Sequence, residues 1–400
     1  MSWDWVAFAD APLQIIDGDR GKQYPKQSDF LSEGPCLFLN TGNVTTNGFA
    51  FADTMFVSEQ KDAALRKGKL TRDDIVMTTR GTIGNCAYYH AQVPYESVRI
   101  NSGMVIFRAQ PERLVPAFLY HYLRSDVFGS KAQAIRSGAA QPQLPIRDIK
   151  TIDLPLPPLP NQKRIAAILS AYDDLIENNR RRIALLEEAA RQLYKEWFVR
   201  FRFPGHEHVK IIDGVPDGWE RKLLGEIARV VMGQSPQSKF YNDAGIGLPF
   251  HQGVTNYGFR FVSHHTYSSA VTKLAEANDI LVSVRAPVGR INITLDRIVL
   301  GRGLSAIRSK SGHQSFLLYA LKEHFYAEDI IGTGAIYAAT NKKELEAQQM
   351  LIPVGPLVTA FEDASLPIDR QITNLTKSVE YLTKARDLLL PKLMSGAIAV

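Results

Sequence analysis

Two stretches of the chain carry the same short pattern, and each contains an arginine placed where it could bind an anion. They read DDIVMTTRGTIG at 73–84 and NDILVSVRAPVG at 278–289. In each, the arginine, Arg80 or Arg285, follows a strand-like apolar run and precedes the glycine of a turn. Each arginine could contact a nucleic-acid phosphate or a guanine edge, or it could have the structural role of holding the end of the strand against the loop. Because both copies share the pattern, we expect it to contribute little to the selection of a particular nucleic-acid sequence.

Polar loops in which the two copies differ are better candidates for selecting a nucleic-acid sequence. They lie at 17–29 and 40–47 in the first copy and at 233–243 and 251–260 in the second. Their side chains match the hydrogen-bonding edges of adenine and guanine, although each is by default a solvated loop residue. The candidates are Arg20, Lys22, Lys26, Asn43, Thr46 and Asn47 in the first copy and Lys239, Tyr241, His251, Gln252, Asn256, Tyr257 and Arg260 in the second. Gln141 and Gln143, in the Gly-Ala loop SGAAQPQ at 137–143, could approach a DNA backbone or an adenine and are added to this set.

Motifs for catalysis are absent from the sequence. There is no phosphate-binding GxxxxGK[ST] loop, no dinucleotide fingerprint and no Asn/Asp-Pro-Pro-aromatic tetrad of amino-methyltransferases. The two cysteines, Cys36 and Cys86, form neither a CxxC pair nor a zinc-ligand set, and HEH at 206–208 has the spacing of no metal motif. Asp53 with EQK at 59–61 resembles a nuclease set only faintly, as scattered residues often do by chance. We therefore expect no catalysis, no metal and no cofactor on this chain.

Composition is that of a cytoplasmic globular protein with a basic surface. The chain has 400 residues, 45% of them hydrophobic and 22% charged, and a formal net charge of +6. This length predicts two or three domains, and the basic balance favours a polyanionic partner. The N-terminus carries acids where a signal peptide needs basic residues, and there is no run of eighteen apolar residues. We expect no membrane association.

The shared pattern is part of a duplication of about two hundred residues. VTTNGFAF at 44–51 returns as VTNYGFRF at 254–261, SGMVIFR at 102–108 as RGLSAIR at 302–308, and AFLYHYL at 117–123 as SFLLYAL at 315–321. Residues 137–160 then match 333–356, which places Gln141 and Gln143 opposite Tyr337 and Ala339, and Gln162 opposite Val358. The chain is therefore two copies of one domain with an appended segment.

Each copy ends in a long helix with an unbroken seven-residue repeat of mainly apolar residues, which is typical of a coiled coil. The seam is Ile165, Tyr172, Asn179, Leu186 and Leu193 in the first helix and Phe361, Ile368, Leu375, Leu382 and Leu389 in the second. Asn161 is available as N-cap after the proline-rich PLPPLP at 155–160, and Pro391 should stop or kink the second helix. Asn179 either sets the register of the pair or lies near the end of the overlap.

These patterns predict an α+β protein in which two mixed α/β domains are joined by two long helices. If a pseudo-two-fold axis relates the copies, the helices form an antiparallel coiled coil that separates two reading domains by a set distance. The expected division is domain 1 at 1–158, spacer helix 1 at 159–203, a linker at 204–218, domain 2 at 219–355, and spacer helix 2 with a C-terminal tail at 356–400.

The chain resembles the specificity subunits of type I restriction-modification systems over essentially its whole length. The resemblance rests on LPLPPLPNQKRIAAILSAYDDLIENNRRRIALLEEAARQLYKEWF after the first domain and on ARDLLLPKLMSGAIAV at the end of the second copy. It implies two target recognition domains that each bind half of a split sequence in double-stranded DNA. It also implies helices that act as spacer and dock two methyltransferase subunits, to which restriction/translocase subunits attach. S-adenosylmethionine, ATP and magnesium would then be bound by the partner subunits, and this chain would catalyse nothing. The alternative is a stand-alone duplicated DNA-binding or assembly protein without a methyltransferase partner.

Overall fold

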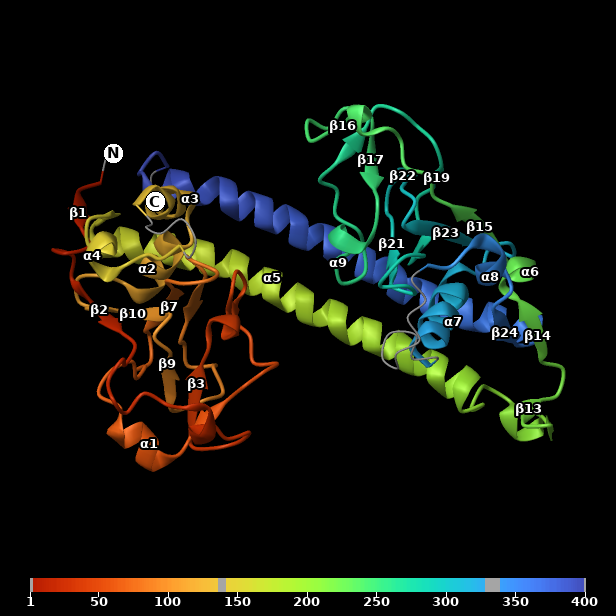
Figure 1. Ribbon diagram of the computed structural model, residues 1–400, viewed down its shortest axis with the longest axis horizontal. Coiled ribbons are helices and arrows are strands. Elements are labelled where there is room, and N and C mark those ends of the chain that lie inside the picture. Colours follow the sequence, from red (N-terminus) through yellow and green to blue (C-terminus); the bar gives the residue numbers. More distant parts are fainter. Residues whose placement is uncertain (1–2, 136–141, 328–338, 399–400) are drawn as a thin grey trace. The chain divides into compact units, whose positions relative to one another are not determined.

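The protein divides into two compact units of mixed α/β structure, each of which includes parts of two long helices (Figure 1). The computed structural model describes residues 3–135, 142–327 and 339–398. One unit is Met1–Arg180 with Lys377–Val400, and the other is Arg181–Thr376. The long helices are α5 (Leu159–Tyr194), extended by a π-helical turn at Lys195–Val199, and α9 (Gly355–Met394). The predicted mixed α/β class and the long helix after the first domain are confirmed.

The two units repeat one topology. Each contains a four-stranded antiparallel sheet, in the order β2-β10-β7-β8 in the first unit and β15-β23-β20-β21 in the second. The first-unit strands are β1 (Trp5–Ala7), β2 (Leu13–Asp17), β3 (Cys36–Leu39), β4 (Val44–Thr45), β5 (Gly48–Phe49), β6 (Phe56–Val57), β7 (Ile75–Thr78), β8 (Cys86–Tyr88), β9 (Val98–Ile100), β10 (Met104–Ala109) and β11 (Asp153–Pro155). The second-unit strands are β12 (Ile211–Ile212), β13 (Val215–Pro216), β14 (Glu220–Leu223), β15 (Ala228–Met232), β16 (Tyr241–Asn242), β17 (Leu248–His251), β18 (Tyr267–Ser268), β19 (Leu274–Ala275), β20 (Ile280–Ser283), β21 (Ile291–Ile293), β22 (Ile298–Leu300), β23 (Leu304–Ser309) and β24 (Gln349–Ile352).

A second sheet in each unit carries the variable loops. It is β6-β3-β9 in the first unit and β16-β18-β17-β22-β19 in the second. Both sheets contain the same parallel pair, in which β3 runs beside β9 and β17 beside β22. Asn40 directly follows β3 in the first unit, and Gln252 directly follows β17 in the second. These two residues therefore occupy the same place in the two units.

The duplicated pattern forms a strand with a carboxylate at its start and a hydroxyl group at its end. Arg108 donates two hydrogen bonds of 2.8 and 2.7 Å to Asp74, and Arg308 donates two of 2.6 and 2.8 Å to Asp279. Each carboxylate is buried, so the paired arginine offsets the cost of removing it from water.

At the other end of the strand, the hydroxyl group closes the turn that follows. The Thr78 oxygen accepts the backbone N–H of Asn85 at 3.2 Å, and the Ser283 oxygen accepts that of Arg290 at 2.9 Å. Gly84 and Gly289 have φ values of 92° and 81°, a left-handed conformation that favours glycine. The aspartate, the hydroxyl residue and the glycine of the repeated pattern thus have structural roles.

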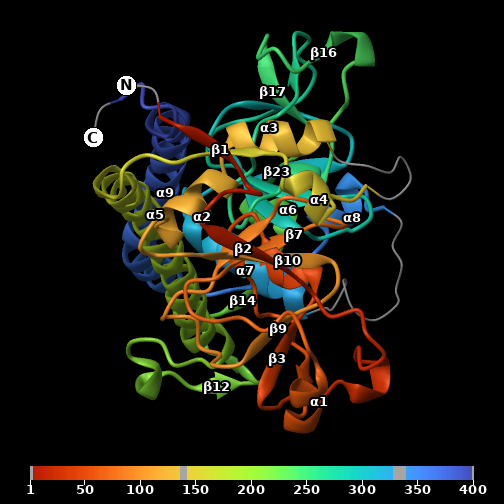
Figure 2. The same cartoon turned by 90° about the vertical axis from the view of Figure 1, so that its left-hand side faces the viewer.

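One helix in each unit packs between the four-stranded sheet and the long helices; Figure 2 shows this for α2. These helices are α2 (Pro116–Leu123) and α7 (Gln314–Ala327). The remaining helices are α1 (Glu59–Ala64), α3 (Asp126–Ile135), α4 (Ile146–Ile149), α6 (Leu224–Ile227) and α8 (Lys342–Glu346). Phe118 and Leu119 of α2 share a core with sheet residues and with Ile165 and Leu169 of α5.

A side chain from a long helix binds the start of each packed helix. Gln162 accepts the backbone N–H of Val115 at 2.8 Å, and Glu362 accepts those of Ser315 and Phe316 at 3.1 and 2.9 Å. In the second unit this role therefore falls to Glu362, one helical turn beyond Val358, the residue that stands opposite Gln162 in the repeat. Both side chains serve as acceptors for the free N–H groups of a helix start.

The long helices contact each other in opposite chain order within each unit. In the first unit Asp173 binds Arg386 at 2.6 Å and the Asn179 amide donates to Ser378 at 3.3 Å. In the second, Tyr194 and Phe198 lie 5.7 and 5.1 Å, ring to ring, from Phe361.

All ten seam residues are buried or half-buried. Ile165, Asn179, Phe361 and Leu375 are buried, and the other six are half-buried.

Two helix boundaries differ from expectation. Helix α5 begins at Leu159, so Asn161 lies inside its first turn and is not the N-cap. Pro160 is tolerated there because the first-turn N–H groups have no partner within the helix. Helix α9 continues through Pro391 to Met394. None of the helices in the described part of the chain is long and apolar enough to cross a membrane.

Glu362→Ala should destabilise the second unit by about 2 kcal/mol, because two buried N–H groups at the start of α7 lose their acceptor. Glu362→Gln keeps one acceptor oxygen, as Gln162 does in the first unit, and should cost less. Urea unfolding followed by the fluorescence of Trp197 and Trp219 measures both effects. Asp363→Ala, at the exposed neighbouring position, is the control; a Glu362→Ala variant as stable as this control would contradict the assignment.

Candidate nucleic-acid interface

Most of the candidate DNA-binding residues of the first unit lie exposed on its loops. Arg20, Lys22, Lys26, Thr46, Asn47 and Arg80 are exposed. Asn47 accepts a hydrogen bond of 2.9 Å from Arg180 of α5, which ties the hairpin of β4 and β5 to the long helix. Gln143 is half-buried, and Gln141 lies outside the described residues.

The second-unit candidates divide by burial. Lys239, Gln252 and Arg285 are exposed, Tyr241, Asn256 and Tyr257 are half-buried, and His251 and Arg260 are buried. The Tyr241 ring stacks on Phe250 with the ring centres 4.5 Å apart, which fixes the start of this loop region.

Three candidates are held inside the protein, and the geometry favours a structural role for each over the predicted DNA contact. Asn43 donates to the carbonyl groups of Ala50 and Asp53 at 3.0 and 2.7 Å, so its amide shapes the loop. His251 lies 2.8 Å from His264, and burial lowers its pKa to about 4. The side chain of His251 is therefore neutral near pH 7.

Arg260 is the third, and it connects its loop to both long helices. Its guanidinium group pairs with Glu187 of α5 and lies 2.6 Å from Asp369 of α9. Burial of Glu187 opposes its ionisation, but Arg260 and Lys322 outweigh this effect and hold the pKa of the Glu187 carboxyl below its ordinary value. Loop sequence alone could not reveal this role, because the two acids lie far from Arg260 in the chain.

The two shared arginines lie where the strand of the repeated pattern meets the returning chain. Arg80 forms an antiparallel bridge with Gln143, and Arg285 forms one with Ala339. These bridges confirm that Gln143 stands opposite Ala339 in the repeat. The backbone of each arginine therefore pairs with the returning chain, while both arginine side chains remain exposed.

A notch of about 170 Å³ adjoins Arg285 in the second unit. Its lining includes Gln252, Gly253, Arg302 and Gly303. Arg302 is not among the DNA-binding candidates predicted from the sequence, because it lies outside the predicted loops, at a position where the first copy has Ser102. A signal was present: the motif RGLSAIR differs from SGMVIFR at its first residue by a full charge.

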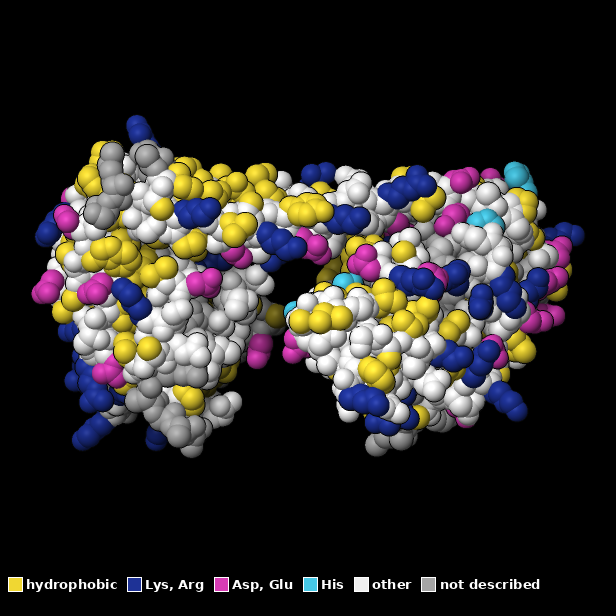
Figure 3. Space-filling model, turned by 90° about the horizontal axis from the view of Figure 1, so that it is seen from above, with side chains coloured by type: hydrophobic (Ala, Val, Ile, Leu, Met, Phe, Trp, Pro, Cys, Tyr) yellow, Lys and Arg dark blue, Asp and Glu magenta, His cyan; other side chains and the backbone are white. Residues whose placement is uncertain are grey.

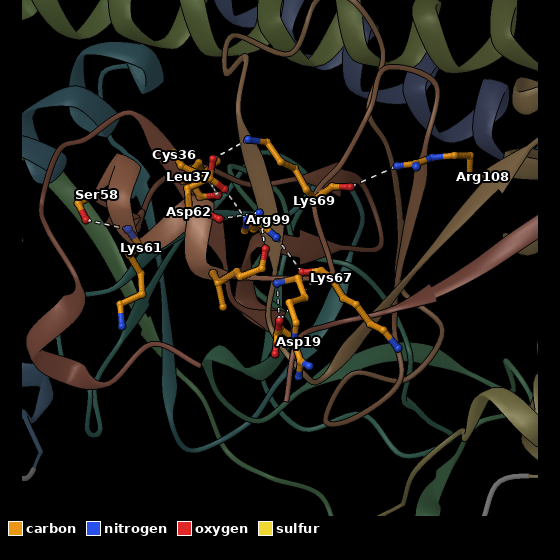
Figure 4. A network of polar contacts seen from close by, with 12 residues as sticks. Asp19, Cys36, Leu37, Ser58, Lys61, Asp62, Lys67, Lys69, Arg99 and Arg108 are labelled. Atoms are coloured by element: carbon orange, nitrogen blue, oxygen red, sulfur yellow. Dashed lines mark hydrogen bonds and ion pairs between the residues drawn. The ribbon is translucent and has the colours of Figure 1, made fainter. Parts of the chain in front are cut away.

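A polar network supports the first-unit loops from inside (Figure 4). Asp62 pairs with Arg99 and Lys69, and Arg99 donates to the carbonyl groups of Lys67 and Leu65 at 2.8 and 3.1 Å. The buried Cys36 donates weakly to Asp62, and burial raises the pKa of its thiol. This cysteine is therefore a packed side chain and not a nucleophile.

Asp19 connects the segment 58–70 to the loop at 17–29. Its carboxylate accepts the backbone N–H groups of Gly21, Arg66 and Lys67 at 2.6, 2.7 and 3.3 Å. Burial opposes ionisation, but these three donors hold the pKa of Asp19 below its ordinary value.

The loops are therefore rigidly supported, and they carry exposed basic and amide side chains. Such a surface can bind DNA but offers no catalytic set. No group of three or more His, Cys, Asp or Glu side chains that could hold a metal is found in residues 3–135, 142–327 and 339–398.

Comparison with known proteins assigns the class. The model of the type I restriction modification DNA specificity domain matches residues 14–188 and again residues 216–356. The chain belongs to this family, whose members are non-catalytic DNA-recognition proteins, and it contains two such domains.

Individual relatives agree with this family. The chain is 31% identical over 359 residues to a protein of Methanocaldococcus jannaschii named as the type I restriction enzyme MjaX specificity subunit, covering 86% of this chain and 83% of that protein. It is 23% identical to the type I restriction enzyme HindI specificity subunit of Haemophilus influenzae, covering 95% and 98%. The crystal structure of a type I restriction-modification S subunit from M. genitalium has the same fold, with a TM-score of 0.64 at 16% identity over 98% of this chain and 96% of that one.

Arg260→Met should destabilise the second unit by about 3 to 5 kcal/mol near pH 7, because Glu187 and Asp369 then remain buried with less compensation. The Glu187 contribution in the unaltered protein is complete above its ordinary pKa of 4.5 and is lost as pH falls through the lowered pKa of the folded state. In the variant, protonation relieves the buried charge, so the deficit should shrink on acidification. Urea unfolding at several pH values measures this difference; a deficit independent of pH would contradict the charge assignment.

Proposed function

We propose that this chain is the specificity subunit of a DNA-modifying complex and reads a split DNA sequence, one half with each α/β domain. The observation that carries the proposal is one domain fold present twice with the same framework and different loops. The Asp–Arg pair and the turn of the repeated pattern are the same in both units. The loop residue that is Asp19 in the first unit is Gln234 in the second, and Ser102 is replaced by Arg302. Two domains with one framework and different reading loops suit two different half-sites.

The long helices act in this proposal as an antiparallel coiled coil that sets the distance between the half-sites. The opposite order of the Asp173–Arg386 and Asn179–Ser378 contacts supports it, as does the burial of the seam. We retain the expected division into two recognition domains, two spacer helices and a linker at 204–218.

The helices also provide a surface for methyltransferase subunits. In the first unit, Ile168 and Leu175 of α5 are 37% and 51% exposed, and Tyr381 and Leu388 of α9 are both 67% exposed. Each pair is seven residues apart, so each forms a stripe on one helix face. Figure 3 shows hydrophobic side chains gathered on this helical part of the first unit. Apolar stripes left uncovered in this way mark an interaction site.

The proposed partners are two methyltransferase subunits and, through them, the restriction/translocase subunits. S-adenosylmethionine, ATP and magnesium would be bound by those partners, and the complex would act on double-stranded DNA in the cytoplasm. The names of the relatives, which are type I restriction enzyme specificity subunits, support this assignment.

Removal of one heptad from each helix, centred on Asn179 and on Ser378, should shorten the recognised gap. Seven residues of helix span about 10.5 Å, which corresponds to about three base pairs. The altered chain, purified with its methyltransferase partner, is tested for methylation of DNA sites whose half-sites are separated by different gaps. Unchanged recognition of the original gap would show that the helices do not set the spacing, and absence of any DNA methylation by the unaltered complex would show that the chain does not serve this function.

Ile168→Ser with Leu175→Ser should weaken association with the methyltransferase subunit, since an apolar contact of about 1 to 2 kcal/mol per side chain is lost. The matched control is Ile211→Ser with Ile212→Ser, which alters two side chains on the β12–β13 hairpin that are at least as exposed. Co-purification and titration calorimetry compare the two double variants. Equal binding by both would exclude the stripe as the docking surface.

A further inference from the structure

We infer that the notch of the second recognition domain binds a phosphate of the DNA backbone between two arginines, Arg285 and Arg302, which come from different parts of the chain. The inference rests on the proposed function and identifies residues of the same DNA-binding surface. It assigns Arg302 to contact with the DNA backbone beside the shared arginine Arg285.

The second-unit notch has a floor of backbone and two arginines on its walls. Gly303 donates its N–H to Gln252 at 3.1 Å, and a Cβ atom at Gly303 would lie 2.4 Å from the same carbonyl oxygen. The Gln252 carbonyl group therefore fills the side-chain face of Gly303, and the two segments pack closely there. The neighbouring Gly253 has open space on its side-chain face.

The two arginines of this notch are free to bind an anion. Arg285 and Arg302 are both exposed, and neither guanidinium group has a carboxylate partner among the described residues. The backbone N–H of Arg302 donates to the Ser235 hydroxyl at 3.1 Å, which holds the segment against the loop at 233–243. Arg308 and Arg260, in contrast, each pair with an acid in the same unit.

The first unit differs at this place. Ser102 stands where the second unit has Arg302, so no arginine arises from this position. Arg20 reaches over from the preceding loop and donates to the Ser102 carbonyl at 3.2 Å, but the same guanidinium nitrogen pairs with Asp17 at 3.2 Å. Arg20 is thus held by a carboxylate, unlike Arg302.

Phosphate is the ligand that this notch suits. Arg285 belongs to the pattern present in both domains, so it should contact what every half-site has, and that is the sugar-phosphate backbone. Arg302 lines the same notch, and two arginines side by side suit the oxygens of a phosphodiester. Base reading is left to the surrounding amide side chains, such as Gln252 and Asn256.

The test uses Arg302→Ser in the full chain, purified with its methyltransferase partner and titrated onto DNA with and without the recognised sequence. Loss of one phosphate contact should lower the slope of log K against log salt by about 0.9 and weaken binding about fivefold at about 0.15 M salt, on both DNAs alike. Arg229→Ser, which removes an exposed arginine of β15 outside the notch, is the matched control and should bind as the unaltered complex does.

Three results would overturn the inference while the unaltered complex still binds its split site. One is binding by Arg302→Ser within twofold of the unaltered complex. Another is a loss of discrimination at a single base pair with an unchanged salt slope, which would make Arg302 a base-reading residue. The third is an equal loss with Arg229→Ser, which would show that any positive charge on the domain counts. Failure of the unaltered complex to bind a split site would instead contradict the proposed function.

Discussion

The structure depends on one constraint: each α/β domain shares its apolar core with both long helices. In the first unit, residues of α2 and its sheet pack with Ile165 and Leu169 of α5 and with Leu393 and Met394 of α9. In the second, Phe361 of α9 is enclosed by residues from the sheet domain and α5. Neither domain can turn on its helices without exposing this core, which makes each unit a rigid support for its loops.

Buried and half-buried ion pairs fix the orientation in which each domain packs on its helices. Asp173 is contacted by Arg124 of its own domain and Arg386 of α9, while Arg260 is held between Glu187 and Asp369. Apolar contacts alone tolerate sliding, but a buried ion pair loses its compensation when displaced. The two units use different residues for this purpose, so the charged contacts are not part of the duplicated pattern. What is common to both is the requirement that a recognition domain be held in one orientation.

Sequence patterns predicted the elements well where periodicity carries the information. The duplication, the mixed α/β class and the long helix at 159–199 followed from repeats and heptads, and the family followed from the resemblance of the helix-start and C-terminal motifs. Predictions for single residues were less informative: Asn43, His251 and Arg260 look like loop contacts in the sequence and are buried in the structure. The partners of Arg260, Glu187 and Asp369, lie far away in the chain, and no local pattern records such a pairing. Asn43 and His251 bind groups 7 to 13 residues away, which only the folded loop brings together. The acceptor role of Glu362 was also not visible in the sequence, because the repeat places Val358, and not Glu362, opposite Gln162.

By itself, the sequence determined that this protein is one domain duplicated and joined by heptad helices, because hydrophobic periodicity and repetition are properties of the chain's order. Only the tertiary structure decided which segments the basic side chains contact and which of them lie next to each other. Arg20 comes to Ser102 and Arg66 to Gly21, while Arg285 and Arg302 line one notch. Folding brings these pairs together through the parallel strands and the close approach of glycine-containing segments. A binding surface is a spatial arrangement of such pairs, so their partners become visible only in the folded protein.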